Sequence, residues 1–207
     1  MPIHLTHRGL SKKNFKENTI KSFKYSFKKK YGIETDLHST KDNELVCFHD
    51  FNLRRKFKIN KKIKDINYSE LKRVSKNYKA EIPLLKELIK ISKNRFPLLL
   101  EIKPLFKKET LMELIELVKK IKKYGIISFK EKNLTNLYKM NKKLPLGLLF
   151  TSAATLKNIK IKSQKKHIKF LVLEKKFLSN KGLGLIRKNI YYYTIKNKTI
   201  FERYKNS

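Results

Sequence analysis

Short apolar segments alternate with helical patterns along nearly the whole chain, and this alternation is what most constrains the fold. The segments expected to form strands are Ile3–His7, Ile33–Leu37, Leu45–His49, Pro97–Ile102, Gly125–Ser128, Leu146–Phe150, Phe170–Leu173 and Ile190–Ile195. Alternation of strands and helices predicts an α/β protein with a mainly parallel sheet and helices outside it. Repeated eight times, this unit forms a TIM-like (β/α)8 barrel, although the 207 residues fall below the about 250 typical of one.

Helices are expected between most of these strands. The segment Asn18–Tyr31 places its apolar side chains on one side, as an amphipathic helix does. Pro83 suits the first turn of a helix. Thr110 and Glu113 have the spacing of a capping box, which predicts that a helix begins there.

Composition predicts one folded cytoplasmic domain over residues 1–207. Hydrophobic residues make up 40% of the chain, which is enough for a core, and no stretch rich in Pro, Gly or Ser marks a boundary. The single cysteine, Cys47, excludes an internal disulfide and fits a reducing compartment. No signal peptide and no run of about 18 apolar residues is found, so we expect no transmembrane segment.

The formal net charge of +35 raises the question of an anionic partner. Only seven of the 52 basic residues are Arg, and the lysines are spread along the whole chain. Proteins that clamp phosphates favour Arg, whose planar fork matches phosphate geometry. We therefore attribute the charge mainly to a bias toward lysine and expect no specific nucleic-acid partner. Weak association with an anionic membrane is allowed.

Polar residues with catalytic potential fall at the ends of the expected strands. Glu34 and Asp36 have the i, i+2 spacing that places two side chains on one face of a strand. Carboxylate oxygens placed in this way can hold a hard cation. His7 and His49 end two other expected strands, and Glu101 lies near the end of a fourth. In a parallel barrel, such residues meet at one rim.

Seven motifs, in order and spacing, resemble those of the glycerophosphodiester phosphodiesterase family. They are His7-Arg8-Gly9, Glu17-Asn18-Thr19, Glu34-x-Asp36, Thr40-Lys41-Asp42, Val46-x-x-His49-Asp50, Ile82-Pro83 and Glu101-Ile102-Lys103. The resemblance implies a distorted phosphodiesterase barrel. It also implies hydrolysis of small glycerophosphodiesters to glycerol 3-phosphate and an alcohol, with Mg²⁺ or Ca²⁺ as cofactor.

The same resemblance implies a role for each site residue. It implies metal ligands at Glu34, Asp36 and Glu101, an acid–base pair at His7 and His49, and phosphate binding by Arg8 and Lys103. Tyr193 is expected to flank the substrate. Asp50 is expected to orient a neighbouring side chain, and Glu17 to pair with Arg8 or cap its helix.

The chain departs from the family pattern at two places. Phe57 stands where the family has a threonine after Leu53 and Arg55, and we expect this to be a minor change in a surface loop. The sequence also ends at Ser207, without the last strand that the family places after its Trp-Thr-Val strand.

The segment from Leu45 to His49 affects how the expected strands are counted. Only a short turn containing Asp42 separates this segment from the strand before it, whereas parallel neighbours need a crossover of about a dozen residues. We therefore expect a hairpin strand, seven parallel strands and an open or partly closed barrel.

Two further functions remain open from the sequence. The same chemistry can act on a lysophospholipid, as in a lysophospholipase D, or on another diester. Alternatively, the chain is a basic binding protein without catalysis on the same scaffold, because a fold alone does not define an activity. The oligomeric state cannot be predicted from the sequence.

Overall fold

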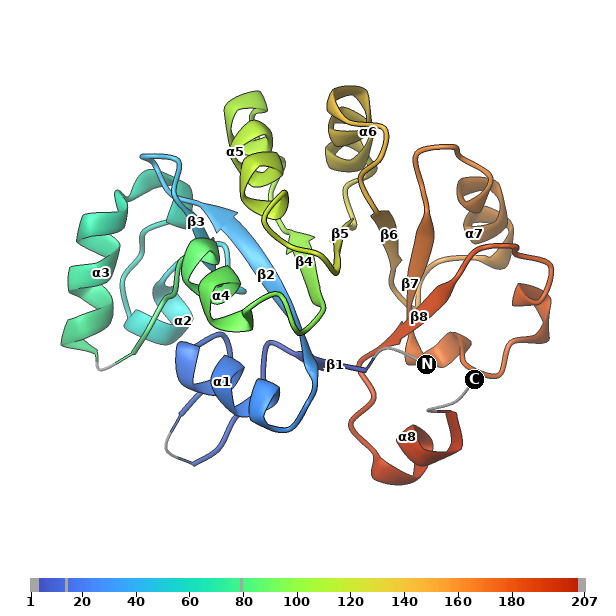
Figure 1. The fold of residues 1–207 in the computed structure, drawn as a ribbon, viewed down its shortest axis with the longest axis horizontal. Helices are drawn as coiled ribbons and strands as arrows, with labels where there is room; N and C mark the ends of the chain where they lie inside the picture. The colour runs from blue at the N-terminus through green and yellow to red at the C-terminus, as the bar shows by residue number, and fades with distance from the viewer. Residues whose placement is uncertain (1–3, 14, 79, 205–207) are drawn as a thin grey trace. The chain divides into compact units, whose positions relative to one another are not determined.

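The computed structural model describes residues 4–13, 15–78 and 80–204, which form two compact units. The first unit spans Leu5–Tyr124. The second contains His4 and the described residues from Gly125 onward. Each unit alternates strands with helices (Figure 1).

The first unit is built on three parallel strands. Strand β2 (Gly32–Ser39) lies between β1 (Leu5–His7) and β4 (Leu98–Ile102) and pairs with both in parallel. Its helices are α1 (Ile20–Lys28), α2 (Arg54–Phe57), α3 (Tyr68–Asn77), α4 (Leu85–Ser92) and α5 (Lys108–Val118), with a 3-10 helix η1 (Ile63–Asp65). Helix α1 packs against β2 and α4.

Strand β3 (Leu45–Cys47) pairs antiparallel with the end of β2. In the turn between them, the Thr40 hydroxyl donates to Asp42 Oδ1 at 2.6 Å, and Asn43 adopts a left-handed φ of 65°. Asn tolerates this conformation better than most residues. The hairpin predicted from the short connection is therefore confirmed.

The chain after β3 folds into a small hydrophobic core of its own. Its buried members come from β3, α2, η1, α3 and the segment before α4: Val46, Phe48, Leu53, Phe57, Ile63, Ile66, Leu71, Ile82 and Leu84. Phe57 is completely buried in it. The replacement of the family's threonine by Phe57 is therefore a core feature, not the surface-loop change that we expected.

The second unit continues the strand–helix alternation. Strands β5 (Tyr124–Ser128), β6 (Leu146–Phe150), β7 (Phe170–Glu174) and β8 (Ile190–Tyr193) follow one another, and β5 to β8 pair in parallel. The helices are α6 (Glu131–Met140), α7 (Leu156–Ser163) and α8 (Lys198–Tyr204), with 3-10 helices η2 (Lys175–Phe177) and η3 (Lys181–Leu183). The α/β class, with seven parallel strands and one hairpin strand, is confirmed.

Several predicted boundaries were wrong. Pro83 precedes α4, and Thr110 lies inside α5, which begins at Lys108. Tertiary contacts override the local signals here, since Cys47 N–H donates to the Pro83 carbonyl and the Thr110 hydroxyl donates to Asn43 Oδ1. The helix predicted over Asn18–Tyr31 spans only Ile20–Lys28.

The strand boundaries also moved. Glu34 and Asp36 lie in the middle of β2 instead of at its end, because β2 continues to Ser39. Strand β3 ends at Cys47, two residues before His49. The start of the first predicted strand, Ile3, lies outside the described residues. Within the described ranges, none of the helices has the length and apolarity needed to span a bilayer.

The buried thiol of Cys47 gives a test of the hairpin. Burial raises the pKa of this thiol to about 12, so it stays protonated at pH 8, and only the thiolate is an effective nucleophile. We expect no alkylation by iodoacetamide at pH 8 in the native protein and complete alkylation in urea, measured by mass spectrometry. Rapid native alkylation would contradict this position for β3.

Candidate active site

The register of the sheet brings four titratable side chains onto one face. In the parallel ladders, His7 pairs with Glu34, and Asp36 pairs with Glu101. Cross-strand partners share a face, and so do residues two apart on one strand. One face of β1, β2 and β4 therefore carries an imidazole and three carboxylates.

The three carboxylates of Glu34, Asp36 and Glu101 form a tight cluster. One oxygen from each lies within 4.8 Å of the others. Burial, followed by repulsion from Asp36 and Glu101, raises the pKa of Glu34 well above its usual value. Burial also raises the pKa of Glu101 to about 7, although Lys103 opposes this shift. Such a cluster is costly to keep ionised unless cations balance it.

The cluster has the features of a divalent cation site. Glu34 Oε2 and Asp36 Oδ1 are buried and accept no hydrogen bond from the described residues. A bound cation would satisfy both atoms. An all-oxygen donor set suits Mg²⁺ or Ca²⁺ better than softer metals.

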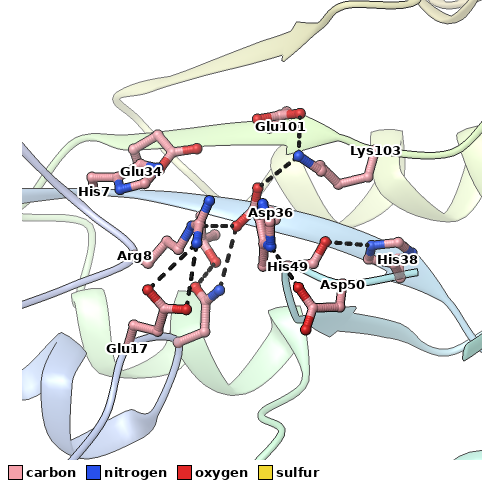
Figure 2. A network of polar contacts seen from close by, with 12 residues as sticks. His7, Arg8, Glu17, Glu34, Asp36, His38, His49, Asp50, Glu101 and Lys103 are labelled. Atoms are coloured by element: carbon pink, nitrogen blue, oxygen red, sulfur yellow. Dashed lines mark hydrogen bonds and ion pairs between the residues drawn. The ribbon is translucent and has the colours of Figure 1, made fainter. Parts of the chain in front are cut away.

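Two basic side chains flank the carboxylates (Figure 2). Arg8 Nε lies 3.0 Å from Asp36 Oδ2, and Lys103 Nζ lies 3.4 Å from Asp36 Oδ1 and 3.1 Å from Glu101 Oε1. Arg8 Nη1 also lies 3.4 Å from Glu17 Oε1. The site thus alternates positive and negative groups, a pattern suited to a phosphate and a metal ion side by side.

A sharp turn after β1 places Arg8. Arg8 and Gly9 both have a left-handed backbone, with φ of 59° and 77°. The Arg8 N–H donates to the Glu34 carbonyl at 2.8 Å, and its own carbonyl accepts from Asn18 N–H at 2.8 Å. A Cβ on Gly9 would lie 2.6 Å from Ser22 Oγ, so glycine is required there.

His49 is held by a chain of charged groups. Its Nδ1 lies 2.7 Å from Asp50 Oδ1, while Arg55 Nε donates to Asp50 Oδ2 at 2.6 Å. Burial raises the pKa of Asp50, but the hydrogen bonds from Arg55 and His49 outweigh it and lower the pKa overall. An ionised Asp50 can only accept a hydrogen bond, so His49 donates to it through Nδ1, which leaves Nε2 free of this contact.

His7 lies at the other end of the network in Figure 2. Its Nε2 is 3.9 Å from Glu34 Oε2, and its side chain is 37% exposed. Burial, with a further contribution from Arg8, lowers the pKa of His7 to about 4. His7 is therefore neutral at neutral pH and able to accept a proton.

Three polar residues support the site without having been assigned a role from the sequence. Asn18 accepts from the Thr35 hydroxyl at 2.8 Å and donates to Asp36 Oδ2 at 3.4 Å. His38 Nε2 lies 3.2 Å from the His49 carbonyl oxygen, and Arg55 clamps Asp50. Asn18 lies in one of the seven motifs and Arg55 follows the family pattern around Leu53, but only the fold shows what these two residues contact.

Tyr193 belongs to the second unit. Its hydroxyl donates to the Phe150 carbonyl at 3.0 Å, and its ring meets Phe129 edge-on. Its place beside the substrate stays a prediction.

Comparison with known proteins agrees with this geometry. The model of the glycerophosphoryl diester phosphodiesterase family matches residues 7–181, which include His7, Glu34, Asp36, His49 and Glu101. The chain belongs to this family.

Curated relatives of the family match parts of the chain. A glycerophosphodiester phosphodiesterase of Caldanaerobacter subterraneus is 34% identical over 163 residues, 70% of this chain and 65% of that protein. Human lysophospholipase D is 41% identical over 69 residues, 33% of this chain and 22% of that protein. These matches span less than two thirds of either relative.

Solved structures of the family share the fold over nearly the whole chain. The Thermotoga maritima glycerophosphodiester phosphodiesterase has a TM-score of 0.83 at 25% identity, covering 99% of this chain and 91% of that one. A phosphodiesterase of Oleispira antarctica gives 0.83 at 22% identity, covering 99% and 89%. The expected class, a distorted TIM-like barrel, is thus the class of this chain.

Replacing Gly9 by alanine tests the turn that places Arg8. The left-handed conformation costs an alanine about 1–2 kcal/mol, and the contact with Ser22 adds strain. We expect Gly9→Ala to lower the free energy of unfolding by about 2 kcal/mol in urea titration.

Gly184→Ala is the matched control. An added Cβ there meets the Lys181 carbonyl at an ordinary 3.4 Å, and the backbone is helical. This variant should leave stability unchanged or raise it by about 0.4–1 kcal/mol. Equal losses in both variants would contradict the assigned turn.

Proposed function

We propose that this chain is a divalent-cation-dependent phosphodiesterase that hydrolyses glycerophosphodiesters to glycerol 3-phosphate and an alcohol. The carboxylate cluster carries the proposal, because two of its buried oxygens accept no hydrogen bond from the described residues and because His7, Arg8 and Lys103 lie beside it. Family membership supports the same chemistry. The Oleispira antarctica structure is described as a complex with the product sn-glycerol-3-phosphate, which supports the substrate class.

Glu34, Asp36 and Glu101 would hold Mg²⁺ or Ca²⁺. When bound, the cation would neutralise negative charge on the phosphoryl oxygens. Arg8 and Lys103 are placed to bind the same phosphate, since both already lie against the carboxylates. Arg8 can do so with two parallel hydrogen bonds.

The two histidines would move the protons. His7, neutral at neutral pH, takes the proton of the nucleophile, which is water or a neighbouring hydroxyl of the substrate glycerol. Attack by the hydroxyl would expel the alcohol and give a cyclic glycerol phosphate, which water would then open to glycerol 3-phosphate. His49 gives a proton to the leaving oxygen. Asp50 orients the His49 ring and stabilises the positive charge that the ring carries before this transfer.

Alanine substitutions test the acid–base pair. Each proton transfer contributes about 10²–10⁴-fold to the rate. We expect His7→Ala and His49→Ala each to lower kcat for glycerophosphocholine by this factor, measured as release of glycerol phosphate.

His167→Ala serves as the control, because His167 lies in the second unit against Glu131 and should keep full activity. Wild-type rates in both site variants would exclude the assigned roles.

Lysophosphatidylcholine should be assayed alongside, since its exclusive hydrolysis would favour a lysophospholipase D activity.

Metal removal tests the carboxylate cluster. We expect EDTA to abolish hydrolysis, and Mg²⁺ or Ca²⁺ to restore it. A cation at 100 times its Kd should also stabilise the fold by about 2.7 kcal/mol, seen as a higher Tm.

Asp36→Asn should lose this shift in Tm. Glu44→Gln, whose carboxylate pairs with Lys86 on the surface, should retain it. A shift that persists in Asp36→Asn would place the cation elsewhere.

A further inference from the structure

A cavity of about 480 Å³ opens beside His49 in the first unit. Its wall includes Lys16, Glu17, Phe48, His49, Arg55 and Lys56. Its volume lies in the range of about 300–1,000 Å³ that is usual for small-molecule sites. Because His49 lines it, the cavity adjoins the phosphate position of the proposed function, on the side of the histidine that protonates the leaving oxygen.

The charge of Arg55 in this wall is already matched. Its guanidinium donates twice to Asp50, at 2.6 and 3.2 Å, and lies 3.6 Å from Glu17. Glu17 in turn contacts Arg8 at 3.4 Å. These acids and arginines neutralise one another, so they give the cavity little net charge.

The two lysines of the wall lack such partners. Lys56 and Lys16 form no ion pair with any residue that the structure describes. Lys56 is half-buried, with its Nζ 5.6 Å from the centre of the Phe48 ring and 5.9 Å from that of Phe57. Burial lowers the pKa of Lys56, although the nearby carboxylates of Glu17, Asp50 and Glu81 oppose this shift. An anion bound in the cavity would give these lysines the direct ion pair that they do not form with the described residues.

The same arrangement disfavours a cationic alcohol such as choline. A quaternary ammonium binds best over an open aromatic face. In this cavity, the lysine ammonium already lies over the Phe48 ring, which is 3% exposed. A second cation would lose that face and meet the positive charge of Lys56 and Lys16.

We propose that this cavity is the leaving-group subsite and that Lys56, with Lys16, selects glycerophosphodiesters whose alcohol carries a second phosphate. The inference rests on the proposed function and names its substrate class. The lysine ammonium binds phosphate as a point charge and lacks the fixed planar geometry of the arginine guanidinium. It therefore suits a second phosphate whose orientation varies from one alcohol to another. Lys56 is a specificity residue here and takes no part in proton transfer.

Three substrates with the same scissile glycerophosphate test the proposal. They are glycerophosphoglycerol, bis(glycerophospho)glycerol and glycerophosphocholine, whose alcohols are neutral, anionic and cationic. We expect wild-type kcat/KM, counted per scissile bond, to be about tenfold higher for bis(glycerophospho)glycerol than for glycerophosphoglycerol. A factor of about ten corresponds to the smallest contribution typical of a hydrogen bond to a charged group. Added salt should reduce this ratio.

Substitutions then assign the preference to Lys56. Lys56→Met should bring the ratio of anionic to neutral substrate close to one, and Lys56→Glu should make glycerophosphocholine the best of the three. Lys64→Met is the matched control, because Lys64 is exposed on η1 and does not line the cavity, and it should keep the wild-type ratio.

Equal kcat/KM for the three substrates in wild type, or an unchanged ratio in Lys56→Met, would overturn the proposal while the proposed function stands. Failure to hydrolyse any diester with metal present would overturn both. Thermal unfolding of each variant shows whether a loss of rate reflects a loss of fold.

Discussion

The first unit depends on keeping three carboxylates together on one face of a sheet. Buried acids at this spacing repel one another, and the raised pKa values of Glu34 and Glu101 record that cost. Arg8 and Lys103 offset part of it through their contacts with Asp36. The surrounding strands and turns hold these charges in place against their repulsion.

The β2–β3 hairpin is the second determinant of the site. If β3 were a parallel strand, a crossover connection would have to precede it. The hairpin instead returns the chain directly to β2, so that His49 follows a short turn. Phe48 N–H then donates to the Asp36 carbonyl at 2.9 Å, and the Phe48 side chain anchors in the core behind β3. The burial of the Phe48 side chain and the hydrogen bond of its N–H therefore fix the backbone position of the next residue, His49.

The sequence predicted what depends on spacing along one strand or on short connections. Glu34 with Asp36, and the hairpin after Leu37, are of this kind. It did not predict the contact of His38 with the His49 carbonyl, which depends on how the hairpin brings two strands together. Nor did it predict the contact of Arg55 with Asp50, which depends on how α2 is placed after Asp50. Thr110 was misassigned for the same reason, since its hydroxyl bonds to Asn43, 67 residues away.

The eight residues from His49 to Lys56 contain two groups of side chains with different proposed roles, and neither group lies on the strands that carry the carboxylates. His49 and Asp50 are the residues that we propose for proton transfer, and Lys56 lines the cavity that we propose for the leaving group. The carboxylates that we propose as cation ligands lie on β2 and β4, outside this segment. Under the proposed function, a substitution at Lys56 would change which alcohols the site accepts and leave the residues proposed for hydrolysis in place, whereas one at Arg55 would also disturb Asp50.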